Sequence, residues 1–105
     1  MRKHDVTQLV GQRILVVEDD AIISLDLESV LAAAGAEVVG PAATVRRALE
    51  LSDALGLTGA IVDLQLQRES AGPVVDNLRR RGIPLFFTLA RRISTRRSHG
   101  PGSPS

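Results

Sequence analysis

Short apolar runs alternate along the chain with longer segments in which apolar residues recur every three or four positions. The runs are rich in β-branched residues and have the length of strands that are buried on both faces of a sheet. The longer segments have the spacing of helices, with Ile23, Leu27, Val30, Leu31 and Ala34 at helical spacing in the first. We predict strands over residues 14–17, 37–41, 59–62 and 83–87, and helices over residues 21–34, 44–56 and 73–81.

Residues that favour helix ends support this division. Gly35 stands where a helix stops, Thr44 is a suitable N-cap, Pro73 suits a first helical turn, and Gly82 follows three arginines at the end of the third helix. Strands that alternate with helices in this way predict one α/β domain with a parallel sheet and right-handed crossovers.

Polar side chains follow three of the predicted strands directly. Glu18 and Asp19 come after the first strand, Asp63 after the third and Thr88 after the fourth. Because the carboxyl ends of parallel strands meet at one edge of the sheet, we expect these side chains to gather there. Clustered carboxylates repel one another unless a cation joins them, and Mg²⁺ prefers such oxygen ligands. The cluster therefore resembles a phosphoryl-transfer site, whereas the next residue, Asp20, is better explained as the N-cap of the first helix.

Composition excludes several classes of protein. The chain of 105 residues has no cysteine, which excludes disulfides, zinc–thiolate sites and iron–sulfur clusters, and its only aromatic residues are Phe86 and Phe87. Without aromatic platforms, and with no helix-turn-helix pattern, we do not expect nucleic acid as a partner. No apolar run is long enough to cross a membrane and none resembles a secretory signal, so we expect a cytoplasmic protein.

Charge divides the chain unevenly. Residues 91–105 contain four arginines, no acidic residue and a final run of only Gly, Pro and Ser. Such a segment buries too little apolar surface to offset its ordering entropy. We therefore expect an N-terminal extension over residues 1–12, a domain over residues 13–90 and a basic tail over residues 91–105.

Three motifs together resemble the receiver domain of bacterial two-component response regulators. They are residues 14–20 (ILVVEDD), 60–64 (AIVDL) and 83–88 (IPLFFT), and the resemblance covers residues 12–90. It implies a flavodoxin-like, doubly wound parallel sheet with strand order 2-1-3-4-5. It also implies a signalling module rather than an enzyme.

The resemblance assigns roles to individual residues. Asp63 would be the phosphoacceptor, with a sensor histidine kinase or a phosphotransfer protein as the donor. Mg²⁺ would be held by Glu18, Asp19, Asp63 and the backbone carbonyl of Gln65, and Thr88 would be the switch hydroxyl. The domain would then act in a phosphorelay through protein–protein contacts.

The sequence departs from the family pattern after Thr88. The seventeen residues that follow do not resemble the last helix, strand and helix of a receiver, and the chain's single lysine, Lys3, cannot match the family's catalytic lysine. A truncation or a shifted reading frame would explain this change. Without those elements we expect Ile83, Leu85, Phe86 and Phe87 to lack cover, as would part of the first helix. A homo-oligomer formed through the fourth strand or the first helix would bury them.

An alternative function remains open at this point. The chain could be a receiver-like interaction module that neither accepts a phosphoryl group nor switches. An Asp-based phosphatase or phosphotransferase is a remoter alternative, because Leu64 and Gln65 follow Asp63 where such enzymes carry a second carboxylate.

Overall fold

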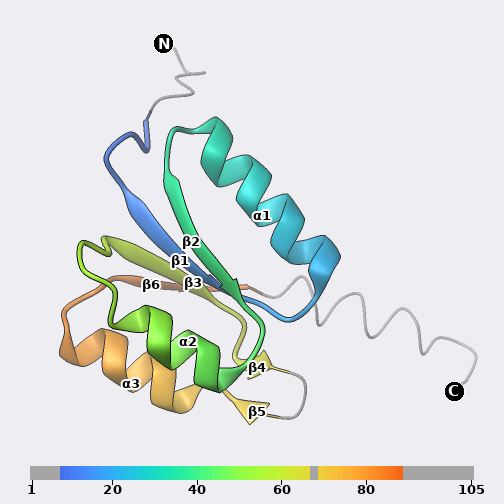
Figure 1. Ribbon diagram of the computed structural model, residues 1–105, viewed down its shortest axis with the longest axis vertical. Coiled ribbons are helices and arrows are strands. Elements are labelled where there is room, and N and C mark those ends of the chain that lie inside the picture. The colour runs from blue at the N-terminus through green and yellow to red at the C-terminus, as the bar shows by residue number, and fades with distance from the viewer. Residues whose placement is uncertain (1–7, 67–68, 89–105) are drawn as a thin grey trace, which may run out of the picture.

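A four-stranded parallel sheet forms the centre of the molecule (Figure 1). The computed structural model describes residues 8–66 and 69–88. The sheet has the order β2-β1-β3-β6, which confirms the predicted receiver-like arrangement of its first four strands. Its members are β1 (Arg13–Val17), β2 (Glu37–Ala42), β3 (Gly59–Val62) and β6 (Leu85–Phe87). The expected basic tail over residues 91–105 and most of the N-terminal extension lie outside the described residues.

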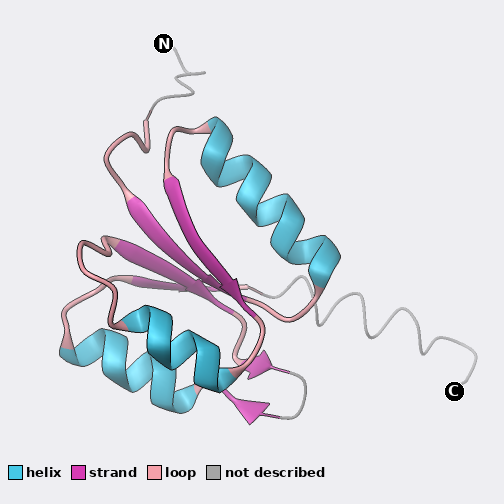
Figure 2. Ribbon diagram, viewed as in Figure 1, coloured by secondary structure: helices cyan, strands magenta, loops and turns pink. Residues whose placement is uncertain are grey.

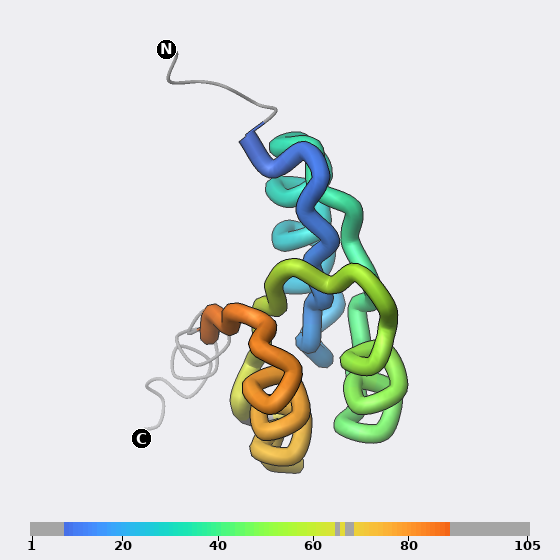
Figure 3. The backbone as a smooth tube through the Cα atoms, turned by 90° about the vertical axis from the view of Figure 1, so that its left-hand side faces the viewer, coloured from blue at the N-terminus to red at the C-terminus, as the bar shows by residue number. Residues whose placement is uncertain are grey.

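Helices cover both faces of this sheet (Figures 2 and 3). On one face, Leu31 packs with Ile14 and Val16 of β1. On the other, alternate strand residues such as Leu15 and Val62 join a larger cluster with two helices. The strands are therefore apolar on both sides, as their continuous apolar runs predict. The helices are α1 (Ala21–Ala33) on the first face and α2 (Val45–Ser52) with α3 (Gly72–Arg80) on the second.

Helix α1 ends where the local sequence predicts, whereas helix α2 ends earlier than predicted. The Asp20 carboxylate caps α1, and Gly35 follows that helix with a φ of 97°, a conformation that glycine adopts without strain. Helix α2 is capped by Thr44 as predicted but ends at Ser52, four residues before Gly56. At this end the Arg81 guanidinium donates hydrogen bonds to the carbonyl of Ser52, the last helical residue, and to that of Ala54 just beyond it, so that both have partners.

A small antiparallel hairpin follows β3 where the sequence predicts only a loop. It consists of β4 (Gln65–Leu66) and β5 (Glu69–Ser70), with Leu66 opposite Glu69. The Leu66 side chain is fully buried in the larger core cluster. This buried anchor holds the hairpin against the domain beside the amino end of α2 (Figure 1).

The expected lack of cover at β6 is confirmed in part. Phe86 and Phe87 are 64% and 46% exposed, but Ile83 is buried, which contradicts its predicted exposure. Ile83 lies before β6 begins, and its amide bonds to the carbonyl of Leu78 at the end of α3, so its side chain enters the core beside that helix. The expected lack of cover on part of α1 is confirmed at Val30, which is 67% exposed.

Other apolar residues of α1 behave similarly. Ile22 and Leu25 are 75% and 62% exposed, so this helix presents apolar side chains to solvent as well as to the sheet. Among the described helices, none combines the length and hydropathy that a bilayer crossing demands.

Candidate functional site

The carboxyl edge of the sheet brings together residues from three strands. Each of Glu18, Asp63 and Thr88 comes one residue after its strand and continues the sheet by one backbone hydrogen bond. Their amides donate to the carbonyls of Ala42 at 2.9 Å, Val17 at 2.9 Å and Val62 at 3.2 Å, respectively. The backbone of each candidate residue is thus fixed by the neighbouring strand rather than left in a free loop.

Three carboxylates meet at this edge. One oxygen from each of Glu18, Asp19 and Asp63 lies within 4.8 Å of the others, which makes them a group able to hold a metal ion. Glu18 and Asp63 are 2% and 3% exposed, and Asp19 is half-buried. The structure therefore brings together the three acidic residues that the sequence singled out, and we refer to them as the acidic cluster.

Asp20 stands apart from the acidic cluster, as predicted. Its carboxylate accepts hydrogen bonds from the amides of Ile22 and Ile23 at 2.9 and 3.0 Å, which is the geometry of an N-cap. Its own amide donates to Oε2 of Glu18 at 3.0 Å. The start of α1 therefore also orients the buried glutamate.

Burial raises the pKa of Glu18 from its ordinary value of 4.5 to about 7. The hydrogen bond from the Asp20 amide opposes this change. The negative charge of Asp63, a hydrogen bond with its side chain and the charge of Asp19 reinforce it. Glu18 consequently takes up the proton that relieves repulsion within the acidic cluster at mildly acidic pH.

The donor set of the acidic cluster fits a hard divalent cation. Three carboxylates close together repel one another in a buried setting, and Mg²⁺ binds such oxygen ligands while keeping waters of its own. Gln65, whose carbonyl the family resemblance adds to the ligand set, is the first residue of β4 and lies two residues after Asp63. Thr88 is half-buried directly after β6.

One residue near this loop was missed by the sequence analysis. Oε1 of Glu69, on β5, accepts a hydrogen bond from the amide of Val45 at 3.2 Å. The two residues are 24 positions apart, and no periodicity or capping pattern links them. All three described helices lack an acidic residue in the first turn, so the sequence carried no signal that set α2 apart.

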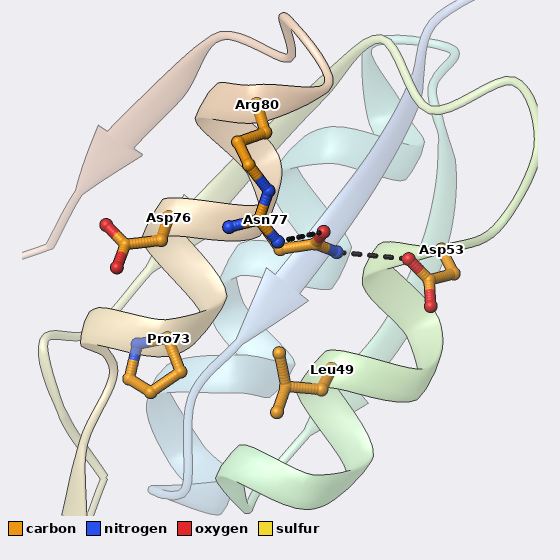
Figure 4. Close-up of a pocket in the computed structure, with 6 residues that line it drawn as sticks. All are labelled: Leu49, Asp53, Pro73, Asp76, Asn77 and Arg80. Carbon is orange, nitrogen blue, oxygen red and sulfur yellow. Dashed lines mark hydrogen bonds between the residues drawn. The ribbon is translucent and has the colours of Figure 1, made fainter.

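A separate groove of about 390 Å³ lies between α2 and α3 (Figure 4). There the Asn77 amide donates to the Asp53 carboxylate at 3.1 Å, and Arg80 donates to the Asn77 carbonyl at 3.1 Å. The groove contains none of the candidate site residues. Its lining is formed by Leu49, Asp53, Pro73, Asp76, Asn77 and Arg80.

Comparisons with known proteins define the class of the chain. No family model matches it. It is, however, 34% identical to SdrG from Pseudomonas melonis Fr1, whose solution structure is that of a BeF3-activated conformation. That match covers 74% of this chain and 67% of SdrG, with a TM-score of 0.62. The crystal structure of the response regulator PhyR from Brucella abortus matches 80% of this chain at 30% identity, with a TM-score of 0.70. The chain therefore belongs to the receiver domain family of response regulators.

Within this family the similarity is to the receivers of PhyR and SdrG. The phyllosphere-induced regulator PhyR of Methylorubrum extorquens is 34% identical over 84 residues, which are 77% of this chain. Those residues are 32% of the relative, so the chain spans about a third of the length of that regulator. PhyR from Bartonella quintana, an anti-anti-sigma factor, has been crystallised with the anti-sigma factor NepR, and the chain matches 35% of it at 27% identity with a TM-score of 0.68.

Proposed function

We propose that this receiver accepts a phosphoryl group on Asp63 in a Mg²⁺-dependent phosphorelay and then acts through protein–protein contacts. The observation that carries the proposal is the acidic cluster, in which a buried Asp63 lies beside two further carboxylates. Membership of the receiver family supports the same role. The donor would be a sensor histidine kinase or a phosphotransfer protein in the cytoplasm.

The chemistry asked of the chain is mainly positioning. A carboxylate oxygen of Asp63 attacks phosphorus while the bond from phosphorus to the donor's histidine nitrogen breaks, and the electron pair leaves with the imidazole. Bound Mg²⁺ would supply charge neutralisation for the phosphoryl oxygens. Asp19, Asp63 and the Gln65 carbonyl would hold it, with Glu18 acting through a water molecule. The hydroxyl of Thr88 would then donate a hydrogen bond to a phosphoryl oxygen and report the modified state.

Intact-mass spectrometry after incubation with acetyl phosphate and Mg²⁺ tests this role. We expect one phosphoryl adduct in the wild type and none in Asp63→Asn. Asp26→Asn, which alters an exposed carboxylate on α1, is the matched control and should keep the adduct. An adduct that persists in Asp63→Asn would place the acceptor elsewhere. A folded wild type without any adduct would favour the alternative role as a receiver-like interaction module.

The partner surface is a second part of the proposal. The complex of PhyR from Bartonella quintana with the anti-sigma factor NepR supports a protein partner for this chain, which matches 35% of that PhyR. The exposed aromatic rings of Phe86 and Phe87 on β6 favour self-association in addition. We propose a homo-oligomer in which β6 or the exposed apolar side chains of α1 are buried against a second copy.

A further inference from the structure

Glu69 connects the loop that follows Asp63 to a helix remote from it in sequence. Its Oε1 accepts a hydrogen bond from the amide of Val45, the first residue of α2. First-turn amides have no acceptor within their own helix, and a negative charge near a helix amino end is favoured by the helix dipole. Thr44 caps the amide of Arg47 at 3.1 Å, so the two acceptors serve different amides of the same turn.

The hairpin that carries Glu69 is fixed to the domain near both of its ends. Opposite Glu69 in the hairpin, Leu66 is fully buried in the core. The amide of Ala71 donates to the carbonyl of Leu64 at 3.0 Å, which closes the loop next to Asp63. Between these points, the contact from Glu69 to Val45 adds an attachment on the side of α2. Gln65 lies within the segment that these three contacts attach to the domain.

We propose that Glu69 is a positioning residue for the candidate site: it ties the hairpin that presents the Gln65 carbonyl to the amino end of α2. This inference rests on the proposed function for its metal-binding consequence. On this proposal the first turn of α2 and the loop that follows Asp63 change position together. Loss of the hydrogen bond between Glu69 and the Val45 amide therefore weakens Mg²⁺ binding, although Glu69 is not itself a ligand.

The experiment compares Glu69→Ala with Glu69→Gln in the full chain. The glutamine retains an oxygen acceptor for the Val45 amide but removes the charge. Amide hydrogen exchange at Val45 and Ala71 is followed without metal, and Mg²⁺ affinity is followed by amide chemical shifts. In Glu69→Ala we expect faster exchange at both amides and Mg²⁺ affinity reduced about three- to tenfold, the range of one hydrogen bond. Glu69→Gln should restore most of both properties.

Glu37→Gln is the control, because Glu37 is an exposed glutamate whose partner, Arg13, lies at the opposite end of the strands. Faster exchange at Val45 alone, with Ala71 and Mg²⁺ affinity unchanged, would reduce Glu69 to a cap of α2 and overturn the inference. So would a glutamine variant that keeps the slow exchange but binds Mg²⁺ as weakly as the alanine variant, since charge alone would then be responsible.

Failure of the proposed function would have a different signature. A wild type that binds no Mg²⁺ contradicts that function. The coupling between the hairpin and α2 would still be supported by faster exchange at Ala71 in Glu69→Ala, and overturned by unchanged exchange there.

Discussion

The amide of Asp63 donates a hydrogen bond to the carbonyl of Val17 over 2.9 Å. This bond extends the pairing of β1 with β3 by one residue, and Glu18 is the residue that follows Val17. Two acidic side chains that are 45 positions apart in sequence are therefore held side by side by the backbone. Their proximity is a consequence of strand register and costs electrostatic repulsion, which the folded protein must relieve by a proton or a cation.

Stability should depend on pH through Glu18. Because the folded protein raises the pKa of Glu18 from 4.5 to about 7, it binds this proton more tightly than the unfolded chain does. The free energy of unfolding should then fall as pH rises through this interval, by up to about 3 kcal/mol. Urea unfolding without Mg²⁺ on either side of the interval measures the change. The glutamine of Glu18→Gln cannot ionise, so this variant should lose most of the change in the free energy of unfolding with pH. If the variant keeps the pH dependence of the wild type, other groups are responsible for it.

Asp19 and Asp20 should separate metal binding from helix capping. Asp20→Ala removes the cap of α1 and should lower the free energy of unfolding by about 1 kcal/mol, while Mg²⁺ still raises the melting temperature. Asp20→Asn keeps a capping oxygen and should be close to the wild type. Asp19→Ala should instead abolish the response to Mg²⁺. Thermal unfolding with and without Mg²⁺ distinguishes them, and a normal Mg²⁺ response in Asp19→Ala would exclude Asp19 as a ligand.

Leu66 should be worth much more to stability than Leu64. Leu66 is fully buried, and Leu66→Ala should lower the free energy of unfolding by about 2–5 kcal/mol through lost contacts and the cavity that remains. Leu64 is 38% exposed, and Leu64→Ala is the matched substitution, with an expected loss of about 1 kcal/mol or less. Equal losses in urea unfolding would show that Leu66 does not anchor the hairpin as described.

Phe86 should contribute to self-association. Its ring is 64% exposed on β6, so Phe86→Ser should weaken a homo-oligomer while leaving the monomer folded. Leu55→Ser, at an 84% exposed position between α2 and β3, is the control for removing surface hydrophobicity elsewhere. Sedimentation velocity over a range of concentrations gives the answer. A wild type that stays monomeric throughout would contradict the proposed oligomer.

The central sheet and the acidic cluster were predictable because local signals agree with the tertiary structure. The apolar runs are short and bounded by polar residues, and parallel strands must place Glu18 and Asp63 at one edge. The role of Asp20 as an N-cap was predictable in the same way, because an aspartate directly before a helical segment commonly caps that helix.

Other features depend on contacts that no local pattern encodes. Apolar residues occur around most of α1, so periodicity could not show that Val30 faces solvent. At the end of α2 the Ser52 carbonyl accepts a hydrogen bond from Arg81, 29 residues further along the chain. Ile83 is buried because it lies beside α3 rather than within β6. The hairpin after β3 depends on the burial of Leu66 and on the hydrogen bond from the Val45 amide to Glu69, and no local pattern indicates either contact.

The placement of Glu18, Asp63 and Thr88 one position after their strands bears on how this site can change in evolution. Each is oriented by a backbone bond, so exchanging one apolar residue for another within a strand leaves its direction intact. A single-residue insertion or deletion in β1 or β3 would turn Glu18 or Asp63 toward the opposite face of the sheet. Strand length, more than strand composition, is therefore the quantity that selection must preserve here.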